Sequence, residues 1–296
     1  MNAVQVALSG AMLGGLYALM AAGVSLTWGV LRVINLAHFG LILLGAYLTY
    51  ELVTVWSVNP VVTIVVTVPV LFLLGAALQW AYDRLGIVEF NSLLVSFGLL
   101  ILVIQVAQNV WSADHHELPR EHNPFVTESV RLGSLVLPNN RIVAIVLALL
   151  VLVGGHLVLR NTFLGRGMRA FAQDRTVAAA FGIDHRRLSV LLGGAAGASA
   201  GVAGMVFMLG NFVQPTTAYE WFGTVFAVVI LGGLGNLLGT LLAGVSVGVV
   251  SGLVSLIWSQ GVEPVALFVA IILALVLRPQ GLFTRTGTLR TRGRAA

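Results

Sequence analysis

Long apolar runs dominate the chain. They fall at about 4–27, 36–55, 60–82, 91–111, 142–160, 188–212, 222–258 and 264–278. Each of the first six has roughly the 20 residues that a helix needs to cross the hydrocarbon of a bilayer. Backbone groups in lipid must bond within their own segment, and no alternating barrel pattern is present. The pattern therefore predicts an all-α polytopic integral membrane protein.

The seventh run is too long for one simple span. The stretch "GGLGNLLGT", residues 232–240, interrupts it and predicts a short half-helix, a turn at membrane depth and then a full helix. The glycines expected to form this break are Gly232, Gly233, Gly235 and Gly239. With the broken segment included, about eight transmembrane helices are expected, in one domain over residues 1–296.

The polar segments between the runs predict the orientation. Segment 161–187 and the tail 279–296 are rich in arginine, and short cytoplasmic loops carry an excess of basic residues. Both are expected in the cytoplasm, whereas the loop 112–141 mixes acids, histidines and prolines and is expected outside. Alternating the membrane crossings back from this loop places the N-terminus outside and Arg32 inside. Residues 28–38 could instead form a broken helix within the membrane.

Composition agrees with this class of protein. Of the 296 residues, 58% are hydrophobic and 9% are charged, whereas a soluble domain carries about 25% charged residues. The chain has no cysteine, which excludes thiolate metal sites and cysteine nucleophiles. The arginines lie between apolar runs, so the high pI reflects membrane orientation, and no nucleic-acid partner is expected.

Two rows of glycine recur at every fourth position. This spacing places the glycines on one helix face and lets a neighbouring helix approach closely. The rows are Gly193, Gly197 and Gly201, and Gly244, Gly248 and Gly252. Both rows are expected at tight helix–helix contacts.

Polar residues inside the runs are candidates for a translocation path. Asn35 and His38 lie three apart, so a helix would place them on one face. Ionisable groups in a membrane are costly and are commonly functional. The alternatives for His38 are a neutral core histidine bonded to a backbone carbonyl, or a metal ligand. Asn91 and Ser96 could equally line a path or bond between packed helices.

Two other motifs resemble a nucleotide site and a zinc site but lack residues that these sites require. "GGLGNLLG" lacks the lysine and hydroxyl residue of a phosphate loop. "DHHELPREH", residues 114–122, begins like a zinc helix, but Arg120 stands where the second histidine is required and Pro119 breaks the helix. No nucleotide, metal or cofactor site is expected in this chain. No nucleophile–base pair or set of metal ligands has a plausible spacing, so the chain is not expected to be an enzyme.

The most polar helical stretch is "MRAFAQDRTVAAAFGIDHRRL", residues 168–188. Its composition predicts one helix over 169–181, with Gly182 at the stop and Asp184 capping the next helix. The helix could lie on the lipid headgroups. Its apolar face is short and rich in alanine, however, which suits insertion into a cleft of another protein. Physical arguments alone leave both interpretations open.

Three stretches resemble the branched-chain amino acid permeases of ABC importers, of the LivH-type subunit. They are "YALMAAGVSLTWGVLRVINLAHFGLILLGAYL" (17–48), "RAFAQDRTVAAAFGID" (169–184) and "VVILGGLGNLLGTLLAG" (228–244). The resemblance covers most of the chain in the same order. It is specific to the family and not to the solute.

The second stretch is similar to the coupling-loop motif of ABC importer permeases, in which alanines precede a glycine. The resemblance places Ala178, Ala179 and Gly182 at the small positions of that motif. Its polar flank would be Arg169, Gln173, Asp174 and Arg175. The chain departs from the motif at Gln173–Asp174, which replaces its acidic start.

The resemblance implies the membrane-spanning subunit of an ATP-driven importer in the bacterial cytoplasmic membrane. Its partners would be two ABC ATPases that use ATP and Mg²⁺, a second permease subunit (a LivM-like sister or a second copy), an external solute-binding protein and the surrounding lipids. The solute would be small and neutral or zwitterionic, with branched-chain or other hydrophobic amino acids favoured. The alternative is a self-sufficient secondary transporter or channel for solutes such as urea or amides. Because the span interiors contain almost no acid, proton coupling is disfavoured.

Overall fold

The structure is a computed structural model. It describes residues 3–87, 89–133 and 135–257, together with Val265, Phe268, Val269, Ile272, Val276, Leu282 and Phe283. Most of the run expected to span at 264–278, and most of the tail 279–296, lie outside the described residues.

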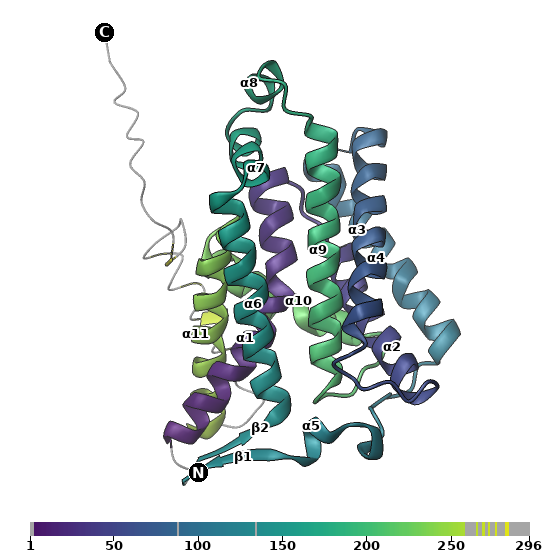
Figure 1. Cartoon of the computed structure of the whole chain (residues 1–296), viewed down its shortest axis with the longest axis vertical. Helices are drawn as coiled ribbons and strands as arrows, with labels where there is room; N and C mark the ends of the chain where they lie inside the picture. Colours follow the sequence, from purple (N-terminus) through teal and green to yellow (C-terminus); the bar gives the residue numbers. More distant parts are fainter. Residues whose placement is uncertain are drawn as a thin grey trace.

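Helices make up nearly all of the described chain (Figure 1). The long helices are α1 (Ala3–Leu26), α2 (Ala37–Thr54), α3 (Ile64–Leu85), α4 (Glu89–Trp111), α6 (Asn139–Asn161), α9 (His185–Met208) and α11 (Leu237–Ile257). The shorter helices are η1 (Thr27–Leu31), η2 (Arg120–His122), α5 (Pro124–Thr127), α7 (Phe163–Gln173), α8 (Arg175–Ala180) and α10 (Thr217–Gly232). Strands β1 (Ser129–Leu132) and β2 (Leu135–Pro138) form an antiparallel hairpin in the loop before α6.

The predicted all-α polytopic architecture is confirmed. Within the described residues, 7 helices are long and apolar enough to cross a membrane, and α10 is a shorter apolar helix. The break predicted in the seventh run lies between α10 and α11. The total of about eight spans stays a prediction, because the segment that follows α11 is largely outside the described residues.

Two helices form the centre of the bundle. Most residues of α1 and α9 are buried, and α1 contacts α6, α9, α10 and α11. The outer helices α3, α4 and α6 instead expose large apolar side chains, including Val65 at 71%, Leu102 at 61% and Leu150 at 65%. Apolar side chains exposed along whole helices suit contact with lipid tails and not with water.

The first span ends in a break and not in a simple loop. After α1 the chain makes the π-helical turn η1, and Arg32 then adopts a left-handed conformation with φ of 57°. Residues 33–35 are not helical, and α2 begins at Ala37. The structure thus has a helix broken within 28–38, which was the alternative to a plain loop at this point.

The two glycine rows lie at helix–helix contacts. A β-carbon added at Gly197 would overlap the Leu71 carbonyl oxygen of α3. One added at Gly244 would lie 2.6 Å from the Gly14 carbonyl oxygen of α1. Gly248 meets Gly10 in the same way, one turn further along the pair. Helix α9 therefore packs backbone-to-backbone on α3, and α11 on α1, as small residues permit in membranes.

The bundle has two distinct ends. Helices α7 and α8 stand at one end, at the top of Figure 1, and α5 with the β1–β2 hairpin stands at the other, beside the N-terminus. At the α7–α8 end, Asp83 near the end of α3 accepts a hydrogen bond from the hydroxyl of Ser189 near the start of α9. The polar segment 161–187 and the loop 112–138 therefore lie on opposite sides of the spans.

Candidate functional site: the coupling segment and the central breaks

The segment 161–187, here called the coupling segment, begins with an elbow that is fixed to α6. The Thr162 hydroxyl accepts a hydrogen bond from the Gly165 N–H at 3.2 Å and caps α7. The Arg169 guanidinium donates to the carbonyl oxygens of Leu159 and Arg160, which are orphan acceptors at the end of α6. A β-carbon at Gly165 would overlap the Leu159 carbonyl oxygen. Helix α7 is thus held tightly against the end of α6.

The continuous helix expected over 169–181 is wrong. Helix α7 ends at Gln173, Asp174 is extended with φ of −151° and ψ of 112°, and α8 begins at Arg175. The Asp174 N–H donates to the Ala170 oxygen, while its own carbonyl accepts from the Ala178 N–H at 3.0 Å. Asp174 therefore closes one helix and opens the next, a position that aspartate favours over helix interiors.

The tip that follows α8 presents an aromatic side chain. Phe181 is 82% exposed, and Ala179 and Ala180 before it are also exposed. Gly182 has φ of +78°, as the predicted helix stop requires, and Asp184 accepts from the N–H groups of the next two arginines to cap α9. The coupling segment thus ends in a defined, outward-facing turn that leads directly into α9.

The residues assigned to the coupling motif occupy different environments. Gln173, Asp174, Ala179 and Gly182 are exposed, whereas Ala178 is only 3% exposed and packs inward. Arg169 is exposed but bonded to the end of α6. Arg175 begins α8, and its side chain is outside the described residues. Their contacts with a partner stay a prediction. Phe181, the exposed aromatic side chain of the tip, was not among them.

Three of the four path candidates gather around the break after η1. His38 is 1% exposed, and its Nε2 lies 3.1 Å from the Met20 carbonyl oxygen. A β-carbon at Gly23 would overlap the imidazole ring, so the ring fills the space that this glycine leaves. This environment matches the core interpretation of His38. Its Nδ1 and the Asn35 Oδ1 are buried without a hydrogen-bond partner among the described residues.

Ser96 ties α4 to the same break. Its hydroxyl accepts from the Leu36 N–H at 3.0 Å and donates to the Ile34 carbonyl oxygen at 3.2 Å. It satisfies backbone groups that the broken helix leaves free. Asn91, also on α4, is exposed and lies apart from the other three candidates. A role in a path remains a prediction for all four.

The glycine break between α10 and α11 is bonded to α1. Gly233 and Gly235 have φ of +86° and +77°, conformations that glycine adopts without strain. The Gly235 N–H donates to the Ser25 carbonyl oxygen at 3.1 Å, and the Thr240 hydroxyl lies 3.1 Å from the Ser25 hydroxyl. A β-carbon at Gly29 would overlap the Gly235 nitrogen. The two broken elements, η1 and the α10–α11 turn, therefore pack directly on each other.

Of the other glycines assigned to this break, Gly232 ends α10 and Gly239 lies in the first turn of α11. A β-carbon at Gly232 would lie 2.6 Å from the Thr240 nitrogen, so the two helices approach each other closely here. Sequence reasoning missed Ser25 and Thr240 because their partners lie 210 and 215 residues away in the chain.

Comparison with known proteins agrees with this architecture. The family described as "Branched-chain amino acid transport system / permease component" matches residues 6–278. The high-affinity branched-chain amino acid transport system permease protein LivH of Salmonella typhimurium is 24% identical over 294 residues and covers 94% of each chain. BraD of Pseudomonas aeruginosa, with the corresponding description, is 23% identical, with 94% of each chain covered.

A third relative matches over a shorter part of the chain. The probable branched-chain amino acid transport permease protein LivH of Methanocaldococcus jannaschii is 25% identical over 232 residues, which cover 76% of this chain and 72% of the relative. No solved structure matches the chain. Since the family match spans nearly the whole sequence and the structure is a multi-pass helical bundle, this chain belongs to the permease component family of branched-chain amino acid transport systems.

Proposed function

We propose that this permease is the membrane-spanning subunit of an ATP-driven importer, and that the tip of its coupling segment holds the ATPases. The observation that carries the proposal is the exposed Phe181, which directly follows α8. Helix α8 stands beyond α7 and the ends of the spans (Figure 1). Large aromatic side chains dominate protein–protein contacts when they enter a pocket of the partner. A helix lying on the lipid headgroups would instead bury its apolar face in the membrane interface.

Arginine placement supports a cytoplasmic position for this end. The described arginines at the α7–α8 end are Arg32, Arg84, Arg160, Arg166, Arg169, Arg175, Arg186 and Arg187. Those at the opposite end are Arg120, Arg131 and Arg141. Basic residues near span ends favour the cytoplasmic side. The coupling segment therefore faces the cytoplasm of a bacterial inner membrane, where ATP is available. The arginine-rich sequence of the tail 279–296 favours the same side.

The family and the named relatives support the rest of the assembly. Two ABC ATPases supply the energy with ATP and Mg²⁺, and a second permease subunit, either a sister chain or another copy, completes the path. An external binding protein delivers the solute. The relatives are described as branched-chain amino acid transport permeases, so the solute is a branched-chain or other hydrophobic amino acid. This subunit contributes the path and no catalysis.

The geometry gives a route for the mechanical signal. A partner that moves the tip at Phe181 also moves Asp184, which caps α9 three residues later. The elbow fixed by Arg169 makes α6 the other end of the same rigid unit. Helix α9 packs on α3 through glycines, which bring the two backbones into contact. ATP-driven closure of the partners would then rock α6 and α9 between outward- and inward-open states.

The alternative, a self-sufficient carrier or channel for urea or amides, has less support. Carriers driven by ions place ionisable groups at membrane depth. Here Glu51 lies near the end of α2 and accepts from the Trp111 indole N–H at 3.0 Å. Asp83 lies near the end of α3 and accepts from the Gln79 amide at 3.0 Å and from Ser189. Both carboxylates are near helix ends and are already engaged.

Extraction of the chain from native membranes in mild detergent tests the proposal. The wild-type chain should co-purify with an ATPase that carries Walker motifs, and Phe181→Ser should release it. Trp56→Ser is the matched control, since Trp56 is 72% exposed at the opposite end. A wild-type chain that copurifies with no ATPase and transports leucine or urea alone in liposomes would refute the proposal in favour of a carrier or channel.

A further inference from the structure

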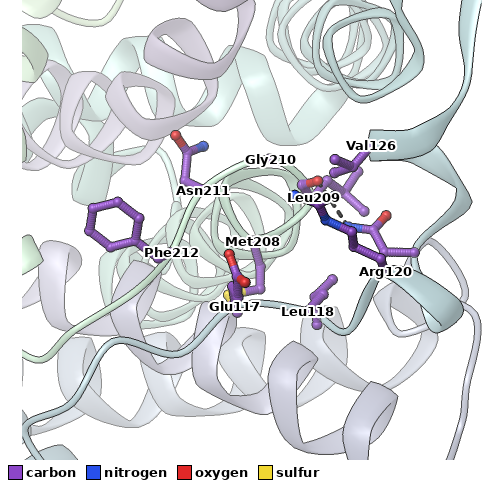
Figure 2. A pocket seen from close by; sticks show the side chains of 10 residues that line it. Glu117, Leu118, Arg120, Val126, Met208, Leu209, Gly210, Asn211 and Phe212 are labelled. Atoms are coloured by element: carbon purple, nitrogen blue, oxygen red, sulfur yellow. Dashed lines mark hydrogen bonds between the residues drawn. The ribbon is translucent and has the colours of Figure 1, made fainter.

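A small pocket lies at the outer end of the bundle, where the loop after α4 passes the end of α9 (Figure 2). Its volume is about 200 Å³. Sites for drug-sized ligands occupy about 300–1,000 Å³. The size of this pocket therefore fits a smaller molecule, of the dimensions of one amino acid. The pocket is separate from the coupling segment and from the path candidates.

The pocket is held in shape by bonds between two distant parts of the chain. The Asn123 amide donates to the Leu209 carbonyl oxygen at 3.1 Å, and Asn123 is only 2% exposed. The backbones of His116 and Val213 exchange two hydrogen bonds of 2.9 and 2.8 Å. The loop is thus fastened to the segment that follows α9 on both sides of the pocket.

The polar lining of the pocket includes one negative and one positive side chain that do not form an ion pair with each other. Glu117 and Arg120 are exposed, and neither side chain forms an ion pair or a hydrogen bond with another described residue. The Asn123 Oδ1 is buried and has no hydrogen-bond partner in the described chain. Because this oxygen has almost no accessible surface, the charged groups that the pocket offers are one carboxylate and one guanidinium.

We propose that this pocket is an outer recognition site for an α-amino acid zwitterion. The Glu117 carboxylate receives the ammonium group, and the Arg120 guanidinium pairs with the carboxylate. The inference rests on the proposed import function and adds a substrate contact on this subunit. Urea and simple amides lack both charges and would leave Glu117 and Arg120 uncompensated.

The apolar lining provides the place for the side chain of the solute. Leu118, Val126, Met208 and Leu209 line the same pocket, and Figure 2 shows Leu118 and Met208 close to Glu117. An aliphatic side chain of valine, leucine or isoleucine can bury its surface here, at about 25 cal/mol per Å². A branched-chain amino acid brings both charges and an aliphatic side chain in one molecule.

Direct binding to the permease complex in nanodiscs, without the external binding protein, tests this site. Radiolabelled L-leucine in equilibrium dialysis should bind saturably. Two competitors dissect the charges: 4-methylpentanoate lacks the ammonium group, and 3-methylbutylamine lacks the carboxylate. Each should compete at least tenfold more weakly than unlabelled leucine.

Charge-neutral variants assign the contacts. Glu117→Gln should weaken leucine binding about tenfold or more and leave competition by 4-methylpentanoate unchanged. Arg120→Gln should weaken leucine similarly and leave 3-methylbutylamine unchanged. Glu121→Gln is the control, because that side chain is 79% exposed and outside the pocket lining. Unchanged melting temperatures of the variants show that the fold is intact.

The outcomes separate this inference from the proposed function. Absence of saturable leucine binding, or equal losses in Glu117→Gln and Glu121→Gln, would overturn the outer site. If ATP-driven uptake with the binding protein persists in that case, the import function stands and only the site fails. If no ATPase assembles with the chain, the import function itself fails, whatever the dialysis result.

Discussion

Substitution of Gly244 by alanine tests the helix packing on which the bundle depends. A β-carbon there would lie 2.6 Å from the Gly14 carbonyl oxygen and 2.7 Å from the Ala18 β-carbon. Ordinary carbon–oxygen contacts begin at about 3.3 Å and carbon–carbon contacts at about 3.5 Å. Helices α1 and α11 must therefore separate by roughly 0.7 Å, which forfeits a quarter to a half of each neighbouring dispersion contact.

Overpacking of this kind costs about 1–3 kcal/mol. Alanine gains about 1 kcal/mol of helix propensity over glycine, and a control must measure that gain separately. Gly154→Ala on α6 provides it, because nothing lies within 4 Å of an added β-carbon. We expect Gly244→Ala to be less stable than Gly154→Ala by roughly 1–3 kcal/mol, because the propensity gain is common to both variants and cancels, which leaves the overpacking cost. Reversible unfolding in micelles measures the difference; equal stabilities would refute the close α1–α11 approach.

Three further substitutions probe the coupling segment and the core. Gly182→Val forces a β-branched residue to φ of +78° and should abolish ATP-driven uptake without loss of insertion. Gly133→Val, at φ of +63° in the β1–β2 hairpin, should leave uptake intact, and equal uptake in the two variants would contradict this. Arg169→Gln removes the bonds to the end of α6 and should speed limited proteolysis within 161–187; a rate matching that of Arg186→Gln would show that the elbow is not held there. His38→Ala leaves a cavity at a buried position and should lower the free energy of unfolding by roughly 2–5 kcal/mol. The yield of folded protein should fall while the KM for leucine is unchanged. Normal yield with an altered KM would place His38 on the path.

Features that depend on local chemistry were predictable from the sequence. The spans follow from runs of about 20 apolar residues, since lipid leaves a helix as the only local solution. The stop at Gly182 and the cap at Asp184 follow from the conformational preferences of those two residues. The break between α10 and α11 follows from the glycines that interrupt the seventh run.

Features that depend on distant partners were not predictable. Asp174 splits the expected helix because its backbone serves α7 and α8 at once, which composition alone does not reveal. Arg169 looks like a free surface charge until the end of α6 is placed beside it. Asn123 meets Leu209 across 86 residues, so the outer pocket exists only in the folded chain. His38 likewise finds Gly23 and Met20 on another helix.

Site-specific crosslinking from Phe181 tests the central claim most directly. The chain has no cysteine, so Phe181→Cys carries a single attachment point for a photoreactive maleimide, and Trp56→Cys provides the control at the other end. In native membranes, the probe at 181 should crosslink to an ATPase with Walker motifs, and the probe at 56 should not. Crosslinks from 181 to lipid alone, with the site fully labelled, would show that the tip lies on the membrane and that no ATPase docks there.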